Sequence, residues 1–154
     1  MDGADYKPDV EFDHASCLGE SWGFGDHKGT LKALSSMTKK RGLVLVGEPH
    51  WLNEPDPEYL KAEDTTRDAY RNHIENVKVG EDLGLRCIYT LDSDREGWDH
   101  YKTLHWWAAE DYIRDNPGDP DITDLRAVNE RYKETYLRWG RDTVGWCIYL
   151  FRKP

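Results

Sequence analysis

Two short apolar runs of the sequence are each followed by polar and aromatic side chains that could do chemistry. The runs are residues 12–18 and 43–46, and the side chains that follow them are Glu20, Trp22, His27, Glu48, His50 and Trp51. If both runs are parallel strands of one sheet, their carboxyl ends lie at the same edge, which is where ligands bind in open α/β sheets. These six residues are therefore the first candidates for an active site.

Glu48 and His50 also have structural interpretations. Glu48 could bond backbone amides of a neighbouring loop, and His50 could be a partly exposed loop histidine, because sequence alone does not show a perturbed pKa. A metal site made of His27, Glu48 and His50 is a third alternative, but these residues lack a fixed ligand spacing such as H-E-x-x-H. We predict no metal and leave the structural and functional roles open.

Composition favours one globular domain and excludes some classes of partner. The chain has 154 residues, of which 38% are apolar, and its formal net charge is -9. A negative chain of this size can bury a core but does not attract a phosphate backbone. No apolar run approaches the roughly 20 residues that span a bilayer, and the N-terminus does not resemble a signal peptide. We expect a cytoplasmic protein with no nucleic-acid or membrane partner.

The three cysteines agree with this compartment. Cys17, Cys87 and Cys147 each lie within an apolar run, and their number is odd. Cysteine in such positions usually behaves as a small buried hydrophobe. We predict free buried thiols, with a catalytic cysteine as the alternative.

The first part of the chain predicts a strand, a crossover helix and a second strand. The helix is capped by Asp26 and ended by Gly42, and the basic residues 39–41 complement its C-terminal dipole. Its apolar positions share one face: Leu31, Leu34 and Met37. The run LVLVGEP follows at once and is typical of a strand covered on both faces. Two neighbouring parallel strands are the economical arrangement.

The rest of the chain predicts three more helices and two more strands. A helix includes residues 69–77, and a strand follows over residues 84–91. Ser93 and Glu96 form a capping-box pattern that starts a helix of about four turns. The sequence DNPGDPD separates it from a second helix, and GWCIYLFRK closes the chain as a strand. Residues 93–142 are thus predicted to be a helical hairpin inserted before the last strand.

Three segments resemble the C-terminal half of class I S-adenosylmethionine-dependent methyltransferases. They are FDHASCLGESWGFGDHKGTLKAL, KKRGLVLVGEPHW and YLRWGRDTVGWCIYLFRK. The resemblance covers nearly the whole chain and relates it to the family's fourth to seventh strands. It implies an α/β fold, a partial Rossmann-like sheet of about four strands with an inserted helical hairpin. Residues 1–154 would be a single partial methyltransferase domain, with residues 93–142 as a lid over the acceptor.

The resemblance also implies what the sequence lacks. The family holds S-adenosylmethionine on a glycine-rich turn after its first strand and on an acidic residue that closes its second. Neither element is found in this sequence, and the glycines of GFGDHKG do not have the spacing of a phosphate-binding turn. The cofactor-binding residues that remain by resemblance are Asp2, Cys17, Leu18 and Gly19. We expect a missing N-terminal half and weak or absent cofactor binding by this chain alone.

Methyl transfer mostly needs a positioned acceptor, and it needs a base only when the acceptor must lose a proton. The resemblance makes Glu48 and His50 the catalytic candidates. The substrate-binding candidates are Glu20, Trp22, His27, Trp51, Trp106 and Trp107. Adjacent Trp106 and Trp107 point about 100° apart on a helix, so one ring is left for a ligand.

The sequence therefore predicts the C-terminal portion of a methyltransferase for a small-molecule acceptor, inactive as this chain alone. Whether the chain by itself is an enzyme is left open. The alternative is a noncatalytic remnant that acts as a binding or oligomerisation module. Such a module would form a homodimer or pair with the missing N-terminal half.

Overall fold

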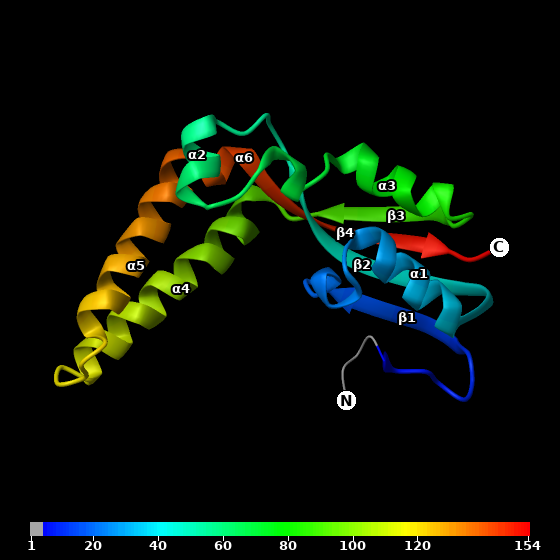
Figure 1. Ribbon diagram of the computed structural model, residues 1–154, viewed down its shortest axis with the longest axis horizontal. Helices are drawn as coiled ribbons and strands as arrows, with labels where there is room; N and C mark the ends of the chain where they lie inside the picture. The colour runs from blue at the N-terminus through cyan, green and yellow to red at the C-terminus, as the bar shows by residue number, and fades with distance from the viewer. Residues whose placement is uncertain (1–4) are drawn as a thin grey trace. The chain divides into compact units, whose positions relative to one another are not determined.

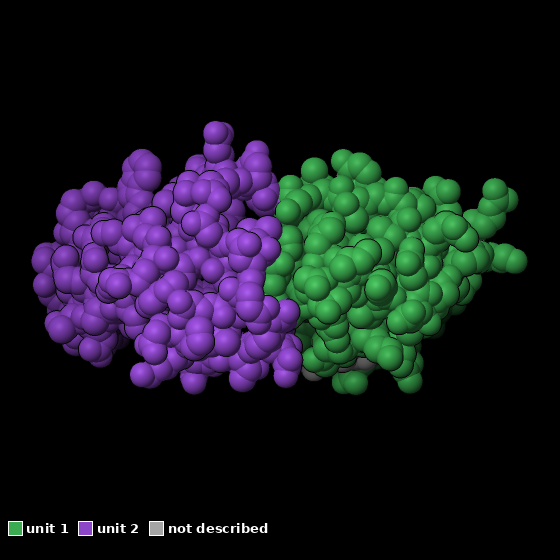
Figure 2. Space-filling view, turned by 90° about the horizontal axis from the view of Figure 1, so that it is seen from above, with its two compact units in different colours: residues 1–51, 70–92, 146–154 green, residues 52–69, 93–145 purple. Residues whose placement is uncertain are grey.

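The computed structural model describes residues 5–154 and divides the chain into two compact units. Unit 1 comprises Met1–Trp51, Tyr70–Asp92 and Trp146–Pro154, and unit 2 comprises Leu52–Ala69 and Ser93–Gly145 (Figure 2). Across residues 5–154, no helix combines the length and the apolar character needed to cross a membrane. Unit 2 thus contains residues 52–69 in addition to the predicted helical insertion.

A four-stranded sheet with the order β1-β2-β4-β3 forms the centre of unit 1 (Figure 1). The strands are β1 (Phe12–Leu18), β2 (Thr38–Trp51), β3 (Arg86–Asp92) and β4 (Val144–Arg152). β1 and β2 are parallel, whereas β3 and β4 are antiparallel. The predicted α/β fold with about four strands is confirmed, and β1 has the predicted bounds.

Two helices of unit 1 pack on one face of this sheet. They are α1 (His27–Met37) and α3 (His73–Asp82), and a short 3-10 helix, η2 (Ser21–Phe24), precedes α1. The core between helices and sheet contains Leu31, Leu34, Val44, Val46, Leu85, Cys147, Tyr149 and Phe151. A Cβ atom on Gly80 would lie 2.2 Å from the Phe151 ring, so only glycine lets α3 approach the sheet this closely.

β2 begins at Thr38, five residues before the predicted run that starts at Leu43. Helix α1 ends at Met37, and Lys39, Lys40 and Arg41 belong to the strand rather than to the end of the helix. Thr38 pairs with Phe12 of β1, and the amide of Arg41 donates to the carbonyl of Lys153. Contacts with β1 and with Lys153 therefore outweigh the helical pattern of these exposed residues. Arg41 adopts a strained left-handed backbone conformation, with a φ of 69°.

Helix α3 begins later than the sequence predicted. Ala69 closes the short 3-10 helix η3 (Arg67–Ala69), and Tyr70 lies in the segment before α3. The start is fixed by a capping box, in which Asn72 accepts from the amide of Glu75 and Glu75 accepts from the amide of Asn72. This reciprocal pair satisfies two helix amides and makes Asn72 the boundary.

Unit 2 is helical. It contains α2 (Pro57–Ala62), α4 (Arg95–Asp115), α5 (Ile122–Thr135), the π-helix η4 (Tyr136–Gly140) and α6 (Arg141–Thr143). α4 and α5 form the predicted antiparallel hairpin (Figure 1), but α4 is 21 residues long, and its cap is Asp94, which accepts from the amide of Gly97. The predicted cap, Ser93, lies one residue before it.

Asp99 of α4 holds the C-terminal part of unit 2. Its carboxylate accepts from Arg141 Nη2 at 2.6 Å, from Arg141 Nε at 2.8 Å and from the Tyr136 hydroxyl at 2.8 Å. The hydrogen bonds from Arg141, together with that from Tyr136, lower the pKa of Asp99 from 3.8 to about 2. This carboxylate thus connects α4 to both η4 and α6.

We expect unit 2 to lose stability between pH 4 and pH 2. The pKa of Asp99 is lower in the folded protein (about 2) than its ordinary value of 3.8, so the unfolded chain takes up this proton first. The stabilisation is therefore complete above about pH 4 and is lost as the pH falls towards 2. Urea unfolding of Asp99→Asn should show a flatter dependence on pH in this window. Asp124→Asn, an exposed position of α5, should keep the wild-type slope; equal slopes for both variants would contradict the assignment.

Strand β1 lies at one end of the strand order and has β2 as its neighbour. The side chains of Phe12 and Leu18 are exposed on it. An edge strand with exposed apolar side chains recruits another strand. A homodimer through this edge remains a prediction.

We expect the isolated chain to sediment as a dimer or larger species at micromolar concentration. Phe12→Lys combined with Leu18→Lys should shift it towards monomer, because charged side chains on an edge oppose strand pairing. Trp22→Lys removes an even more exposed apolar side chain outside the strand and should leave the assembly unchanged. A wild-type chain that is a monodisperse monomer would rule out the edge contact.

Candidate active site

The carboxyl ends of β1, β2 and β3 lie at the same end of the sheet. The amide of Gly19, just after β1, donates to the carbonyl of Gly47 in β2 at 3.3 Å. The Trp146 ring at the start of β4 covers Gly47, where a Cβ atom would lie 2.7 Å from it. His50 in β2 contacts Asp92 at the end of β3. This is the edge at which open α/β sheets bind ligands.

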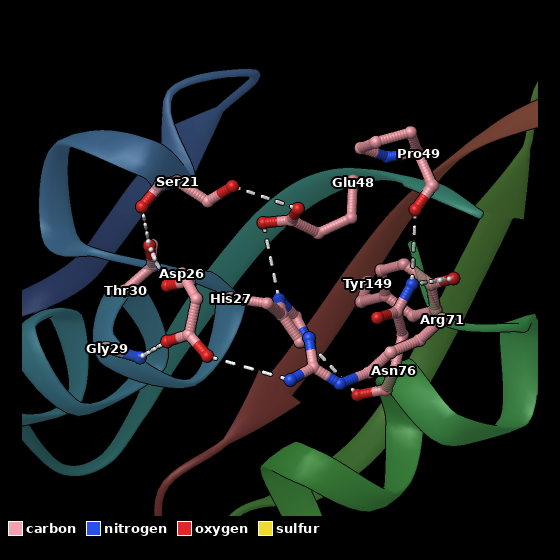
Figure 3. A network of polar contacts seen from close by, with 10 residues as sticks. All are labelled: Ser21, Asp26, His27, Gly29, Thr30, Glu48, Pro49, Arg71, Asn76 and Tyr149. Carbon is pink, nitrogen blue, oxygen red and sulfur yellow. Dashed lines mark hydrogen bonds and ion pairs between the residues drawn. The ribbon is translucent and has the colours of Figure 1, made fainter. Parts of the chain in front are cut away.

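Glu48 of β2 is buried and is held by two residues from the segment after β1 (Figure 3). Its Oε2 atom accepts from the Ser21 hydroxyl at 3.0 Å. Its Oε1 atom lies 3.3 Å from His27 Nδ1, although the two atoms do not form a well-directed hydrogen bond. Two of the predicted site residues, His27 and Glu48, are therefore in direct contact.

The contacts of His27 fix where its protons lie. His27 Nε2 lies 3.0 Å from the carbonyl oxygen of Asn76, which only accepts, so Nε2 carries a hydrogen. His27 Nδ1 and Glu48 Oε1 then face each other, and without a proton between them two lone pairs would meet. Glu48 is thus the polar neighbour of His27 Nδ1, at a separation of 3.3 Å.

Asn76 of α3 connects this pair to a second polar group. Its side-chain amide donates to the Tyr149 hydroxyl at 3.2 Å and to the carbonyl of Pro49 at 3.4 Å. Its own backbone carbonyl accepts from His27. One buried asparagine thus satisfies groups on α1, β2 and β4 (Figure 3).

The Tyr149 hydroxyl donates a hydrogen bond to His73. Because it already accepts from Asn76, it donates to His73 Nδ1, which lies 3.2 Å away. Burial raises the pKa of Tyr149 above its usual value, so the hydroxyl keeps its proton. Burial and the neighbouring His50 lower the pKa of His73, which favours the neutral ring that this hydrogen bond requires.

His50 is held by Asp92. His50 is 2% exposed, and its Nε2 lies 2.9 Å from Asp92 Oδ1. The His73 ring meets it edge to face, with the ring centroids 5.2 Å apart. His50 Nδ1 is buried and has no hydrogen-bond partner within residues 5–154. The predicted catalytic residues Glu48 and His50 therefore differ: both carboxylate oxygens of Glu48 face a polar group, and one nitrogen of His50 does not.

The other predicted substrate-binding residues are dispersed. Glu20 is exposed at the start of η2, and Trp22 is 75% exposed within it. Trp51 is buried against Tyr70, with the ring centroids 4.9 Å apart. In unit 2, Trp106 packs against Tyr136 whereas Trp107 is 67% exposed. Their part in substrate binding stays a prediction.

The predicted cofactor-binding residues lie at the end of β1, except Asp2, which is outside the described residues. Leu18 is exposed, and Gly19 has a φ of 77°, which only glycine adopts freely. Burial raises the pKa of the Cys17 thiol, and the charge of Glu48 adds to this rise. Cys17, Cys87 and Cys147 are free thiols, and burial raises the pKa of Cys147 to about 11. Protonated thiols are poor nucleophiles.

Sequence reasoning missed five residues of the network: Ser21, His73, Asn76, Asp92 and Tyr149. One of them left a signal, because Asn76 lies four residues before Gly80 and so shares with it the helix face that packs on the sheet. A polar residue on an inner helix face needs partners. The partners themselves come from strands far apart in the sequence and left no local signal.

Comparisons with known proteins agree with this architecture. No protein-family model matches the sequence. The Escherichia coli protein YjhP is 28% identical over 151 residues, which are 96% of this chain and 60% of YjhP. The crystal structure of YjhP superposes with a TM-score of 0.91 at 26% identity, over 100% of this chain and 64% of YjhP.

Two solved structures of methyltransferases are equally similar. A SAM-dependent methyltransferase from Thiobacillus denitrificans, in complex with S-adenosylhomocysteine, has a TM-score of 0.90 and 27% identity over 100% of this chain. One from Geobacter sulfurreducens, with the same ligand, has a TM-score of 0.91 and 23% identity over 100% of this chain. This chain spans 63% of each of these proteins and 60% of YjhP.

We expect Glu48→Ala to destabilise the protein and Glu48→Gln to be tolerated. The alanine removes the carboxylate from the partly buried Ser21 hydroxyl and from the buried His27 Nδ1, at about 1–3 kcal/mol. The glutamine oxygen can accept from Ser21 while its amide donates to a neutral His27, so its cost should stay within about 1 kcal/mol. Urea unfolding measures both.

Glu54→Ala is the matched control, because Glu54 makes an exposed ion pair with Arg67. Its effect should be below about 1 kcal/mol. If Glu48→Gln destabilises as much as Glu48→Ala, hydrogen bonding to Ser21 and His27 does not account for the stabilising effect of Glu48.

Proposed function

We propose, from the class I S-adenosylmethionine-dependent methyltransferase fold of this chain, that it is the acceptor-side portion of a methyltransferase for a small molecule. The observation that carries the proposal is the match of 100% of the chain, at a TM-score of 0.90, to a methyltransferase in complex with S-adenosylhomocysteine. The buried polar network at the carboxyl ends of β1, β2 and β3 supports it. Since the chain spans about three-fifths of its relatives, activity is proposed for the protein that also has the remainder.

The end of β1 fits one part of a cofactor site. Cys17, Leu18 and Gly19 would hold S-adenosylmethionine, which supplies a methyl group on a sulfonium. The left-handed backbone of Gly19, with a φ of 77°, favours glycine at this position. The exposed backbone of this turn suits close approach of a ligand. Asp2 is proposed to contact the adenine by resemblance alone.

Glu48 and His50 are proposed to serve the acceptor in different ways. Glu48 keeps the Ser21 and His27 side chains in place, because it faces both of them. His50 has a nitrogen free to accept a proton. Trp22 and Glu20, exposed after β1, are proposed to contact the acceptor. The three free cysteines support a cytoplasmic location.

A noncatalytic binding or oligomerisation module is the second candidate. The exposed apolar side chains of the edge strand β1 favour it, because they suit pairing with another strand. The two candidates differ in what a restored chain does. A methyltransferase gains cofactor binding and turnover when the rest of the fold is supplied, and a module gains neither.

We expect this chain alone to bind S-adenosylmethionine with a dissociation constant weaker than about 10 μM, which corresponds to about 7 kcal/mol. The decisive experiment uses a chimera of this chain and YjhP. In the chimera, this chain replaces the matching part of YjhP, and the rest of YjhP is kept in its own order. Calorimetric titration of the chimera should show tighter binding than the chain alone, and methyl transfer from labelled cofactor should be detectable. A folded chimera that binds no cofactor would overturn the proposal.

Trp107 is expected to contribute to acceptor binding, because its ring is exposed on a helix whose neighbouring Trp106 is packed. In the chimera, Trp107→Ala should raise KM for the acceptor more than KM for the cofactor, at little cost to stability. Tyr132→Ala removes another exposed aromatic ring of unit 2 and serves as the control. Unchanged acceptor kinetics for Trp107→Ala would make the hairpin a structural element only.

A further inference from the structure

One imidazole of the network has a fixed hydrogen and a free lone pair. Asp92 Oδ1, as part of a carboxylate, only accepts, so His50 Nε2 at 2.9 Å carries the hydrogen between them. In the neutral ring, Nδ1 is then the nitrogen without a hydrogen. Asp92 thus selects one of the two tautomers of His50, in the way that an orienting carboxylate does for a catalytic histidine.

The free nitrogen is an unusual feature of a buried side chain. Buried polar atoms almost always have a hydrogen-bond partner, and leaving one without costs about 1–3 kcal/mol. The nearest ring does not serve His50 Nδ1, because His73 makes an edge-to-face contact and uses its own Nδ1 for Tyr149. A donor from a bound molecule would satisfy this atom.

The position of the pair agrees with such a role. His50 and Asp92 lie at the carboxyl ends of β2 and β3. His50 is buried, whereas the Asp92 side chain is 44% exposed, so the pair lies directly beneath the protein surface. Glu48 differs, because its two oxygens face Ser21 and His27.

We propose that Asp92 is a positioning residue that holds His50 Nδ1 as the proton acceptor, and that the methyl acceptor is a group that must lose a proton, a hydroxyl or an ammonium. This inference rests on the proposed function and narrows its substrate class. Neither Asp92 nor the choice of nitrogen follows from the sequence.

The proton balance of the step is complete. The electron pair of the acceptor atom, which for an ammonium is the pair that loss of its hydrogen leaves on nitrogen, forms a bond to the methyl carbon, and the carbon–sulfur bond breaks with its electron pair left on sulfur. His50 Nδ1 takes the hydrogen of the acceptor atom and becomes part of an imidazolium. The Asp92 carboxylate, still bonded to Nε2–H, compensates the new charge. The positive charge lost at sulfur is thus the charge gained at His50.

The first test is nitrogen NMR of the labelled chain, which distinguishes a bare ring nitrogen from a protonated one. In the wild type, His50 should be bare at Nδ1 and protonated at Nε2. In Asp92→Asn the amide can also donate, so the opposite tautomer should become populated. Asp13→Asn, at a carboxylate on β1 that pairs with Lys39, is the control and should leave His50 unchanged. A wild-type His50 protonated at Nδ1 overturns the inference, even if Asp92→Asn does not fold.

The second test separates a base from a structural contact, in the chimera described above. The probes are phenol and ethanolamine, which carry a proton on the acceptor atom at neutral pH, and pyridine, which does not. Asp92→Asn should lower kcat about 100-fold for the first two, with KM nearly unchanged, because a general base contributes at least that much. Turnover of pyridine should change less than roughly threefold, and Asp13→Asn should change nothing.

The outcomes distinguish the two proposals. An active chimera in which Asp92→Asn affects all three probes equally overturns the positioning role and leaves the proposed function standing. A chimera that binds the cofactor but methylates no probe overturns the assignment of the acceptor class. A folded chimera that binds no cofactor overturns the proposed function, and this inference with it.

Discussion

The structure of unit 1 depends on hydrogen bonds that satisfy polar side chains buried between its helices and its sheet. Glu48, His27 and His50 are all nearly inaccessible to water, and burying such groups without partners would cost several kcal/mol. Asn76 of α3 links the Glu48–His27 contact to the Tyr149–His73 contact, because its carbonyl accepts from His27 and its side-chain amide donates to Tyr149. The docking of α3 on the sheet, already tight at Gly80, is therefore specified by polar as well as apolar contacts.

The two ends of this network have different chemical properties. At the Ser21 end, Glu48 Oε2 accepts from the Ser21 hydroxyl, and Glu48 Oε1 lies 3.3 Å from His27 Nδ1. At the Asp92 end, the hydrogen bond to His50 leaves one nitrogen without a partner beneath a partly exposed carboxylate. A protein whose network served only to pack helices against strands would gain stability by satisfying that nitrogen. This asymmetry is the basis of the proposed acid–base role of His50.

In unit 2, a single carboxylate connects several elements through hydrogen bonds. Asp99 accepts from Arg141 and Tyr136, and the aromatic rings of Tyr136 and Trp98 lie around the ammonium of Lys102. Burial lowers the pKa of this lysine. Asp99 therefore makes specific contacts between α4, η4 and α6, and Lys102 has aromatic neighbours on α4 and η4.

The sequence by itself determined the order of the four strands and of helices α1, α3, α4 and α5, and the resemblance to class I methyltransferases. Turn residues, caps such as Asp26 and apolar periodicity act over a few residues, and these local signals place β1 at residues 12–18. The sequence also pointed to Glu48, His27 and His50, because polar residues after strands lie where α/β sheets bind ligands. Only the tertiary structure decided that β2 starts at Thr38, that His27 meets Glu48, and that Asp92 holds His50. These contacts join residues 21 to 42 positions apart and depend on strand register and helix docking, which local pattern does not encode.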